Sequence, residues 1–172
     1  MSDINIRIAS TDDALLIATI SRQTFYDTYA AENTAENMEK FLTLQFNEEK
    51  LIKEVGADGN YFYLAYIKNT IAGYIKIKEA VHPNLTERNP IELSRIYVCK
   101  GFIGKAVGRA LMQTAIDFAK ERGKDCLWLI VWKENKKALR FYQSFQFEIF
   151  AENIFILGDD HQSDWVMKKL IE

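Results

Sequence analysis

The stretch IELSRIYVCKGFIGKAVG (residues 91–108) joins an apolar strand to a glycine-punctuated turn and then to an amphipathic helix. Gly101, Gly104 and Gly108 allow the backbone to turn and to come close to a ligand. The first N–H groups of the following helix have no partner inside the helix, and the helix dipole is positive at this end. These features predict a phosphate site built from backbone atoms.

Two common phosphate-binding motifs do not fit the spacing of this stretch. A Walker A loop requires G-x-x-x-x-G-K-[ST], but Gly104-Lys105 is followed by Ala106, and Cys99 stands at the position of the first glycine. A dinucleotide fingerprint requires G-x-G-x-x-G in an opening βαβ unit, whereas these glycines are spaced G-x-x-G-x-x-x-G deep in the chain. For the turn taken alone, a connection that binds nothing remains an alternative.

Composition and charge limit the class of protein. The chain has 172 residues, 48% of them hydrophobic, which suits one domain with a sizeable core, and we expect a single domain over residues 1–172. A net charge of −2 argues against a nucleic-acid partner. No apolar run is as long as a membrane span, and the start MSDINIRIAS lacks a signal-peptide pattern. We therefore expect a cytoplasmic protein with no membrane partner.

The cysteines and histidines are too scattered for a metal site. Cys99 and Cys126 are the only cysteines, and neither belongs to a C-x-x-C pair or a Cys/His cluster. His82 and His161 are isolated from each other. We therefore expect no bound metal and a protein whose thiols stay reduced.

Hydrophobic periodicity predicts strands and helices along the whole chain. Strands are expected over residues 5–9, 61–67, 71–77, 91–98, 126–132, 147–157 and 164–169. Helices are expected over residues 10–30, 35–44, 47–55, 105–122 and 133–145. The predicted class is α+β with a mixed sheet.

The strand over residues 91–98 has an irregular pattern. Ile91 and Leu93 are apolar at odd positions, whereas Ile96 and Val98 are apolar at even positions. A strict period of two cannot place all four side chains on one face, so the pattern predicts a β-bulge near Ser94. Such a bulge would separate the end of this strand from its neighbour and free backbone groups for a ligand.

A second informative stretch is WKENKKALRFYQSFQF (residues 132–147). Asn135, Ala138 and Tyr142 stand at i, i+3 and i+7, so on a helix they share one stripe that offers an amide, a gap and a phenol. Phe141 and Phe145 on a neighbouring face are expected to pack on the sheet. The polar atoms of Asn135 and Tyr142 would need partners in such a position.

Both stretches resemble the signatures of the GNAT superfamily of acetyl-coenzyme A-dependent N-acetyltransferases. The first signature, [QR]-x-x-G-x-[GA] after a hydrophobic-x-Val strand end, falls on Ile103, Ala106 and Gly108 after residues 96–98. The second, N-x-x-A-x-x-F/L-Y-x-x-x-G-F, falls on residues 135–147. The resemblance implies a mixed, mostly antiparallel sheet of about seven strands, helices on both faces, and a splayed fourth and fifth strand.

The resemblance also implies roles for particular residues. Asn135 would contact the pantetheine arm of acetyl-coenzyme A, and Tyr142 would protonate the departing thiolate. Cofactor-binding residues are expected to be Ile96, Tyr97, Val98, Ile103, Gly104, Lys105, Ala106, Val107, Gly108, Arg109, Asn135 and Ala138.

Three positions depart from the usual signature residues. Ile103 replaces Gln or Arg and Ala106 replaces Gly, which a cradle of backbone N–H groups can tolerate if the backbone angles suit them. Gln146 replaces the Gly before the final Phe, so we expect it to adopt a left-handed conformation or the turn to differ.

Acetyl transfer to an amine needs a base, because alkyl amines with a pKa of about 10.4 are protonated at neutral pH. Glu92 aligns with the position where histone-type members of the superfamily carry their general base, and such a carboxylate can act directly or through a water. A strand-edge glutamate in solvent, with a water chain as the base, remains the alternative. The N–H groups of residues 96–98 are the expected donors to the thioester oxygen.

The acceptor site is expected to combine aromatic rings and carboxylates from two segments. Phe25 and Tyr29 lie in TFYDTY, and Asp159 and Asp160 lie in the run LGDDHQSDW, which contains a third aspartate, Asp164. Both segments resemble those of bacterial spermidine/spermine (PaiA-like) N-acetyltransferases, which implies a small amine, such as a polyamine, as acceptor.

Three alternatives for function and assembly stay open. A protein that binds acyl-coenzyme A as a sensor would need the phosphate cradle but neither Tyr142 nor Glu92. An acetyltransferase for protein termini or lysines would need an open groove instead of an acidic pocket. A homodimer is compatible with everything in the sequence.

Overall fold

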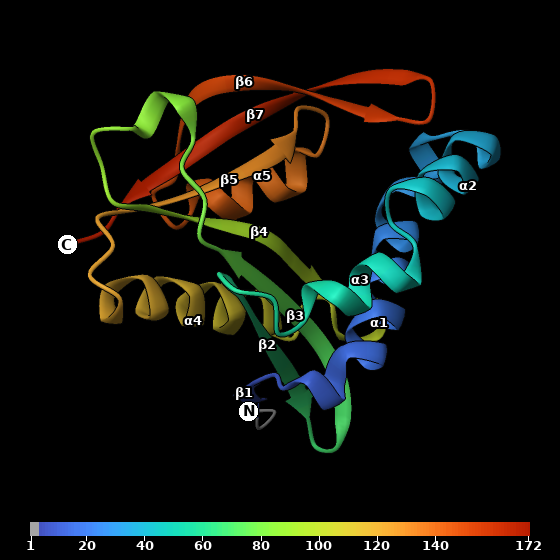
Figure 1. Cartoon of the computed structure of the whole chain (residues 1–172), viewed down its shortest axis with the longest axis horizontal. Helices are drawn as coiled ribbons and strands as arrows, with labels where there is room; N and C mark the ends of the chain where they lie inside the picture. The colour runs from blue at the N-terminus through green and yellow to red at the C-terminus, as the bar shows by residue number, and fades with distance from the viewer. Residues whose placement is uncertain (1–3) are drawn as a thin grey trace.

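The computed structural model describes residues 4–172, which form one seven-stranded mixed sheet (Figure 1). The strands lie in the order β1-β2-β3-β4-β5-β7-β6, and every neighbouring pair is antiparallel except β4 and β5, which are parallel. The strands are β1 (Ile4–Ile8), β2 (Asn60–Ile67), β3 (Thr70–Lys78), β4 (Pro90–Val98), β5 (Cys126–Trp132), β6 (Glu148–Leu157) and β7 (Asp160–Leu170). The predicted fold class is confirmed.

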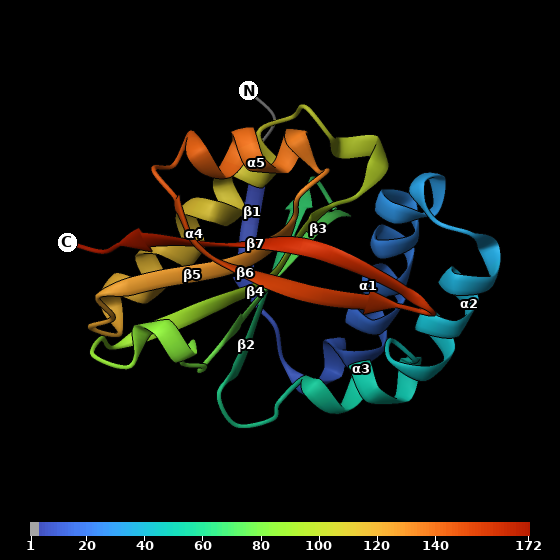
Figure 2. The same cartoon turned by 90° about the horizontal axis from the view of Figure 1, so that it is seen from above.

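Helices cover both faces of the sheet (Figure 2). They are α1 (Ala14–Tyr29), α2 (Ala35–Leu44), α3 (Glu48–Glu54), α4 (Val107–Glu121) and α5 (Lys136–Gln143). α4 and α5 pack on one face through the largest core cluster, which includes Leu111, Met112 and Phe147. α1, α2 and α3 pack on the other face through two smaller clusters, centred on Ile17 and Phe41.

The predicted β-bulge and the separation of the two central strands are confirmed. Along the β3–β4 ladder, Lys76 pairs with Arg95 and the next residue, Ile77, pairs with Leu93, so Ser94 is the extra residue. β4 and β5 pair only from Pro90 to Glu92, although both strands continue well beyond that point. The strands therefore diverge directly after Glu92 and leave a gap in the sheet, which we call the β4–β5 opening.

Two predicted helices begin later than their sequence patterns suggested. α4 was expected from residue 105, but it begins at Val107 because Ala106 takes left-handed angles (φ 63°, ψ 4°) that end any helix before it. α5 was expected from residue 133, but Asn135 is its N-cap, with the side-chain oxygen accepting from the Ala138 N–H at 3.1 Å. Asn135 thus stands at the start of the predicted stripe and not inside the helix.

The last strand was expected to begin at residue 164, but β7 begins four residues earlier, at Asp160, and forms a long hairpin with β6. The tip of this hairpin reaches α2 in both views (Figures 1 and 2). Lys40 on α2 donates to the Asp159 carboxylate at 2.6 Å, and the Asp159 N–H donates to Asn37 at 3.2 Å. Gln162 donates to Asn33 at 2.7 Å, which fixes the hairpin further.

Candidate active site

The turn before α4 presents backbone N–H groups that are free to bind an anion. Phe102 donates to the Cys99 oxygen at 2.8 Å and Lys105 to the Phe102 oxygen at 3.2 Å. Within residues 4–172, no hydrogen bond is formed by the N–H groups of Gly104, Ala106 or Gly108. These groups surround the N-terminus of a 15-residue helix, where the helix dipole favours an anion.

The two unusual residues of this turn are compatible with an anion cradle. Ile103 has an ordinary extended backbone (φ −61°, ψ 136°) and its side chain points to solvent, 50% exposed. Ala106 follows the left-handed path that a glycine would adopt, so the backbone keeps the course that the usual glycine would give it. Lys105 and Arg109 lie over the rings of Phe102 and Phe145 and add positive charge beside the turn.

The β4–β5 opening exposes N–H groups on one edge of β4. The Cys99 N–H donates to Ala72 on β3 at 2.9 Å. Because N–H groups alternate in direction along a strand, those of Ile96 and Val98 point away from β3 and toward the opening. No strand among the described residues pairs with β4 there.

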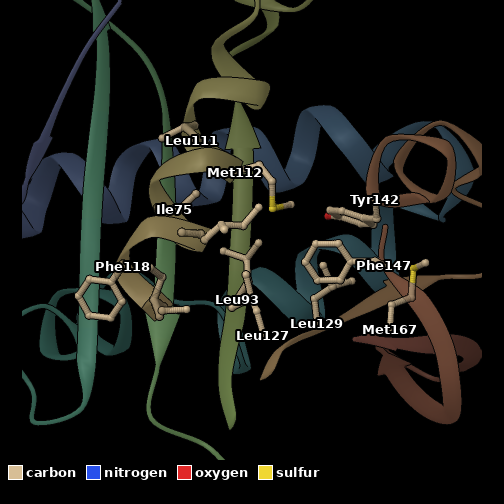
Figure 3. Packing of buried hydrophobic residues seen from close by; sticks show 14 of the residues in the cluster. Ile75, Leu93, Leu111, Met112, Phe118, Leu127, Leu129, Tyr142, Phe147 and Met167 are labelled. Carbon is tan, nitrogen blue, oxygen red and sulfur yellow. The ribbon is translucent and has the colours of Figure 1, made fainter. Parts of the chain in front are cut away.

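Tyr142 lies on α5 with its ring buried between Phe141 and Phe147, at centroid distances of 5.6 and 6.0 Å. Its hydroxyl points away from Phe147 toward Met112 (Figure 3). Burial raises the pKa of Tyr142 above its usual range, and the nearby Tyr29 raises it further. The phenol is therefore protonated at neutral pH and can donate a proton.

A buried carboxylate, Asp164, lies beside aromatic residues at the end of β5. It pairs across the strands with Trp132, and the Trp132 ring is 6.3 Å from that of Tyr29. Burial raises the pKa values of Tyr29, Tyr97 and Tyr142. Asp164 adds to this effect at Tyr29, and Tyr29 adds to it at Tyr97 and Tyr142, so these groups lie within electrostatic range of one another. We call Tyr29, Tyr97, Trp132 and Asp164 the Asp164 cluster.

The sequence had shown Asp164 only as the third aspartate of an acidic run. The alternation of side chains along the strand could have indicated the burial of Asp164. In a strand that begins at Asp160, the side chains of Gln162, Asp164 and Val166 lie on the same face, and all three are buried. Burial raises the pKa of Asp164 to about 6, against smaller lowering effects of Asn153 and Lys133.

Glu92 lies at the last paired position of β4 and β5, opposite Trp128. Burial raises its pKa, while the positive charges of Lys78, Lys76 and Arg95 act in the opposite direction. Glu92 thus sits at the base of the β4–β5 opening, with three cations within electrostatic range; two of them, Lys76 and Arg95, form ion pairs with Glu54.

The other residues predicted for the acceptor site lie in different surroundings. Phe25 is buried in the core between α1 and α2, stacked on Phe41 at 4.5 Å. The carboxylate of Asp159 binds Lys40, and that of Asp160 accepts from Gln162 at 3.0 Å. Of the four residues expected to bind the acceptor, Tyr29 alone belongs to the Asp164 cluster.

The comparisons with known proteins agree on one family. Residues 22–147 match the model of the acetyltransferase (GNAT) family. The chain is 36% identical over 172 residues to an uncharacterised N-acetyltransferase of Lactobacillus delbrueckii subsp. lactis, covering 99% of both chains.

The chain belongs to the GNAT family of acetyltransferases. It is also 27% identical over 173 residues to a spermidine N(1)-acetyltransferase of Thermoplasma acidophilum, with 98% of each chain covered. Its fold is similar to the crystal structure of the PaiA N-acetyltransferase from Thermoplasma acidophilum in complex with coenzyme A. That likeness has a TM-score of 0.77 at 24% identity and covers 98% of this chain and 99% of the other.

The enzyme is an acetyl-coenzyme A-dependent N-acetyltransferase. The free N–H groups of the turn, the nearby cations and the gap between β4 and β5 suit a long cofactor with a pyrophosphate group. No group of three or more metal-ligating side chains occurs within residues 4–172. In the same part of the chain, no helix combines the length and the apolar character that crossing a membrane requires.

Proposed function

We propose that the enzyme transfers the acetyl group of acetyl-coenzyme A to a primary amine of a small polycation, such as spermidine or spermine. The observation that carries this proposal is the Asp164 cluster, in which a buried carboxylate lies among aromatic rings. Carboxylates and aromatic faces together favour an alkylammonium ion. The likeness to a spermidine N(1)-acetyltransferase over the full length of the chain supports the same acceptor class.

The residues predicted to bind the cofactor divide into two groups in this proposal. The backbone of residues 103–109 would hold the pyrophosphate, helped by Lys105 and Arg109. The pantetheine arm of the cofactor would lie in the β4–β5 opening, lined by residues 96–98, Asn135 and Ala138. When bound, acetyl-coenzyme A supplies an acetyl group activated as a thioester.

Other groups of the protein would stabilise the charge that develops on the thioester carbonyl and transfer protons during the reaction. The Ile96 and Val98 N–H groups would stabilise negative charge on the carbonyl oxygen, which they can do without reorganising because β3 already fixes the strand. Tyr142 would give its proton to the departing sulfur. The base has two candidates: Glu92, predicted from sequence, and Asp164.

The proposal includes the organisation of the chain. We propose a single acetyltransferase domain over residues 1–172, because β1, β6 and β7, which extend beyond the family match, belong to the same sheet as the matched strands. The cytoplasmic location and the homodimer considered from sequence remain predictions.

One assay tests the acceptor class. Release of free thiol from acetyl-coenzyme A is measured with matched panels of polyamines, aminoglycoside-type antibiotics, amino acids and peptides. We expect the highest kcat/KM with a polyamine. A preference for peptides would favour a protein acetyltransferase, and tight coenzyme A binding without turnover on any amine would favour a sensor.

A further inference from the structure

We propose that the Asp164 carboxylate binds the attacking ammonium group of the acceptor and removes its proton. This inference rests on the proposed function, because it requires an amine acceptor. It assigns the base to β7, whereas the sequence had pointed to Glu92 on β4.

Asp164 is a buried carboxylate that forms no ion pair with a cation among the described residues. The residue is 4% exposed, and no ion pair reaches it within residues 4–172. The nearest candidate cation, Lys133, instead binds Glu152 at 2.8 Å and lies 3.9 Å from the centroid of the Trp165 ring. Burying an unpaired carboxylate is unfavourable, so its presence is explained if a cationic ligand completes the pair.

Asp164 also lies among aromatic residues. Trp132 is its cross-strand neighbour on β5, and Tyr29 lies within electrostatic range. The faces of Tyr and Trp rings attract ammonium groups. Because Tyr29 also acts on Tyr142, the carboxylate and the predicted acid both lie within electrostatic range of the same tyrosine.

Asp164 and Glu92 differ in their position relative to the β4–β5 opening and in the charges near them. Glu92 lies where β4 and β5 are still paired, whereas Asp164 lies opposite the last residue of β5, where the strands have separated. Lys76, Lys78 and Arg95 act on Glu92 and would repel an approaching ammonium group. Of the two carboxylates, Asp164 has the environment that an ammonium ion needs.

In the proposed reaction, two protons leave the attacking nitrogen, one to Asp164 and one to Tyr142. The ammonium group gives one proton to Asp164, and the freed nitrogen lone pair forms the C–N bond with the acetyl carbon as the C–S bond breaks. Tyr142 gives its phenolic proton to the sulfur and regains one from the acylated nitrogen. Asp164 returns its proton to water after the neutral amide leaves.

The pH dependence follows from the groups that face Asp164. These are Tyr29 from α1, Lys133 after β5 and the amide Asn153 from β6. Asp164 has a raised pKa of about 6, so the active carboxylate form increases as pH rises through this value. We expect kcat/KM for spermidine to rise with pH through about 6 and then to level off.

The experiment compares D164N with E92Q and with E148Q, in which Glu148, an exposed carboxylate on β6, serves as the matched control. kcat/KM for spermidine is measured from about pH 5 to 9, and calorimetry measures the binding of coenzyme A and then of spermidine to the coenzyme A complex. We expect D164N to lower kcat/KM at neutral pH by about 100-fold or more and to remove the rise near pH 6. Spermidine binding should weaken by about tenfold or more, while coenzyme A binding stays unchanged.

Several results would overturn the assignment. One is a D164N enzyme whose kcat/KM stays within about threefold of wild type, and another is a rise near pH 6 that disappears in E92Q but not in D164N. If D164N is misfolded and fails to bind coenzyme A, the pH profiles of the wild-type enzyme and of E92Q decide. A rise in kcat/KM near pH 6 that is present in both enzymes supports the proposal. A wild-type profile without this rise overturns it. If the wild-type enzyme neither binds nor acetylates any polyamine, the proposed function is overturned as well. If the wild-type enzyme acetylates polyamines and D164N does so equally well, only the role of Asp164 is overturned.

Discussion

Substitution of Tyr142 by Phe separates the chemistry of the hydroxyl from the packing of the ring. The ring contacts of Tyr142 with Phe141 and Phe147 are kept in this variant. The hydroxyl takes part in no hydrogen bond found within residues 4–172, so its removal breaks no such bond. We therefore expect the free energy of unfolding to change by less than about 0.5 kcal/mol.

Activity should respond very differently from stability. If Tyr142 protonates the leaving sulfur, its loss should lower kcat by about 10²- to 10⁴-fold, the range for one general acid. Because burial raises the pKa of Tyr142, the wild-type phenol should stay protonated, and kcat should not fall between about pH 7 and 9. Thiol release gives kcat, denaturant unfolding gives stability, and calorimetry shows whether coenzyme A still binds.

The matched control is Tyr26→Phe, because Tyr26 lies on α1 with 51% of its surface exposed. It should leave kcat, stability and coenzyme A affinity unchanged. The reasoning about Tyr142 is refuted if Tyr142→Phe keeps kcat within about threefold of wild type while it binds coenzyme A normally.

Three further predictions concern the backbone, one ion pair and the phosphate cradle. Gln146→Gly should raise Tm by about 1–2 °C in a thermal melt, because the residue has φ 66° and the relief of left-handed strain exceeds the added entropy of the unfolded chain; a fall in Tm would contradict this. Asp13→Asn should lower stability by about 1 kcal/mol at pH 7, after allowance for solvent screening of the partly exposed pair with Arg7. Since this ion pair lowers the folded-state pKa of Asp13 to about 2, the wild-type advantage should be lost as pH falls toward that value in unfolding titrations, and a constant difference would exclude the pair as its cause. Lys105→Ala combined with Arg109→Ala should weaken coenzyme A binding, measured by calorimetry, by about 3- to 10-fold at low salt and by less at high salt. An equal loss of affinity at both salt concentrations would argue against contact of these two side chains with the phosphates.

Much of the fold could be read from periodicity because its elements are regular and strongly patterned. α2 and β5 begin and end at the predicted residues. The bulge at Ser94 could be predicted because an inserted residue moves apolar side chains from odd to even positions, and this change is visible in one strand alone. The left-handed angles of Gln146 were expected from the resemblance to the GNAT signature, because Gln146 stands where that signature has a glycine.

The acceptor side of the site could not be derived in the same way. Asp160 and Asp164 follow Gly158, and polar residues after a glycine are typical of a loop, so the start of β7 was hidden. Its strand state depends on pairing with β6 in the hairpin and on contacts of the hairpin tip with α2, which is far away in the sequence. Phe25 was predicted to line the acceptor site because the sequence alone does not show whether an aromatic residue on a helix contacts a ligand or packs in the core.

Sheet topology explains why the separate parts of the site meet. β4 and β5 are the one parallel pair among the described strands, and a parallel pair requires a crossover, here α4. The N-terminus of α4, with its free N–H groups, therefore lies at the carboxyl end of β4, the same end at which the strands diverge. β7 is antiparallel to β5, so its early residues, including Asp164, return to that end beside Trp132. A cofactor held by the turn and an amine held at Asp164 would thus approach the β4–β5 opening from two sides, which suits direct transfer between them without an intermediate carrier on the protein.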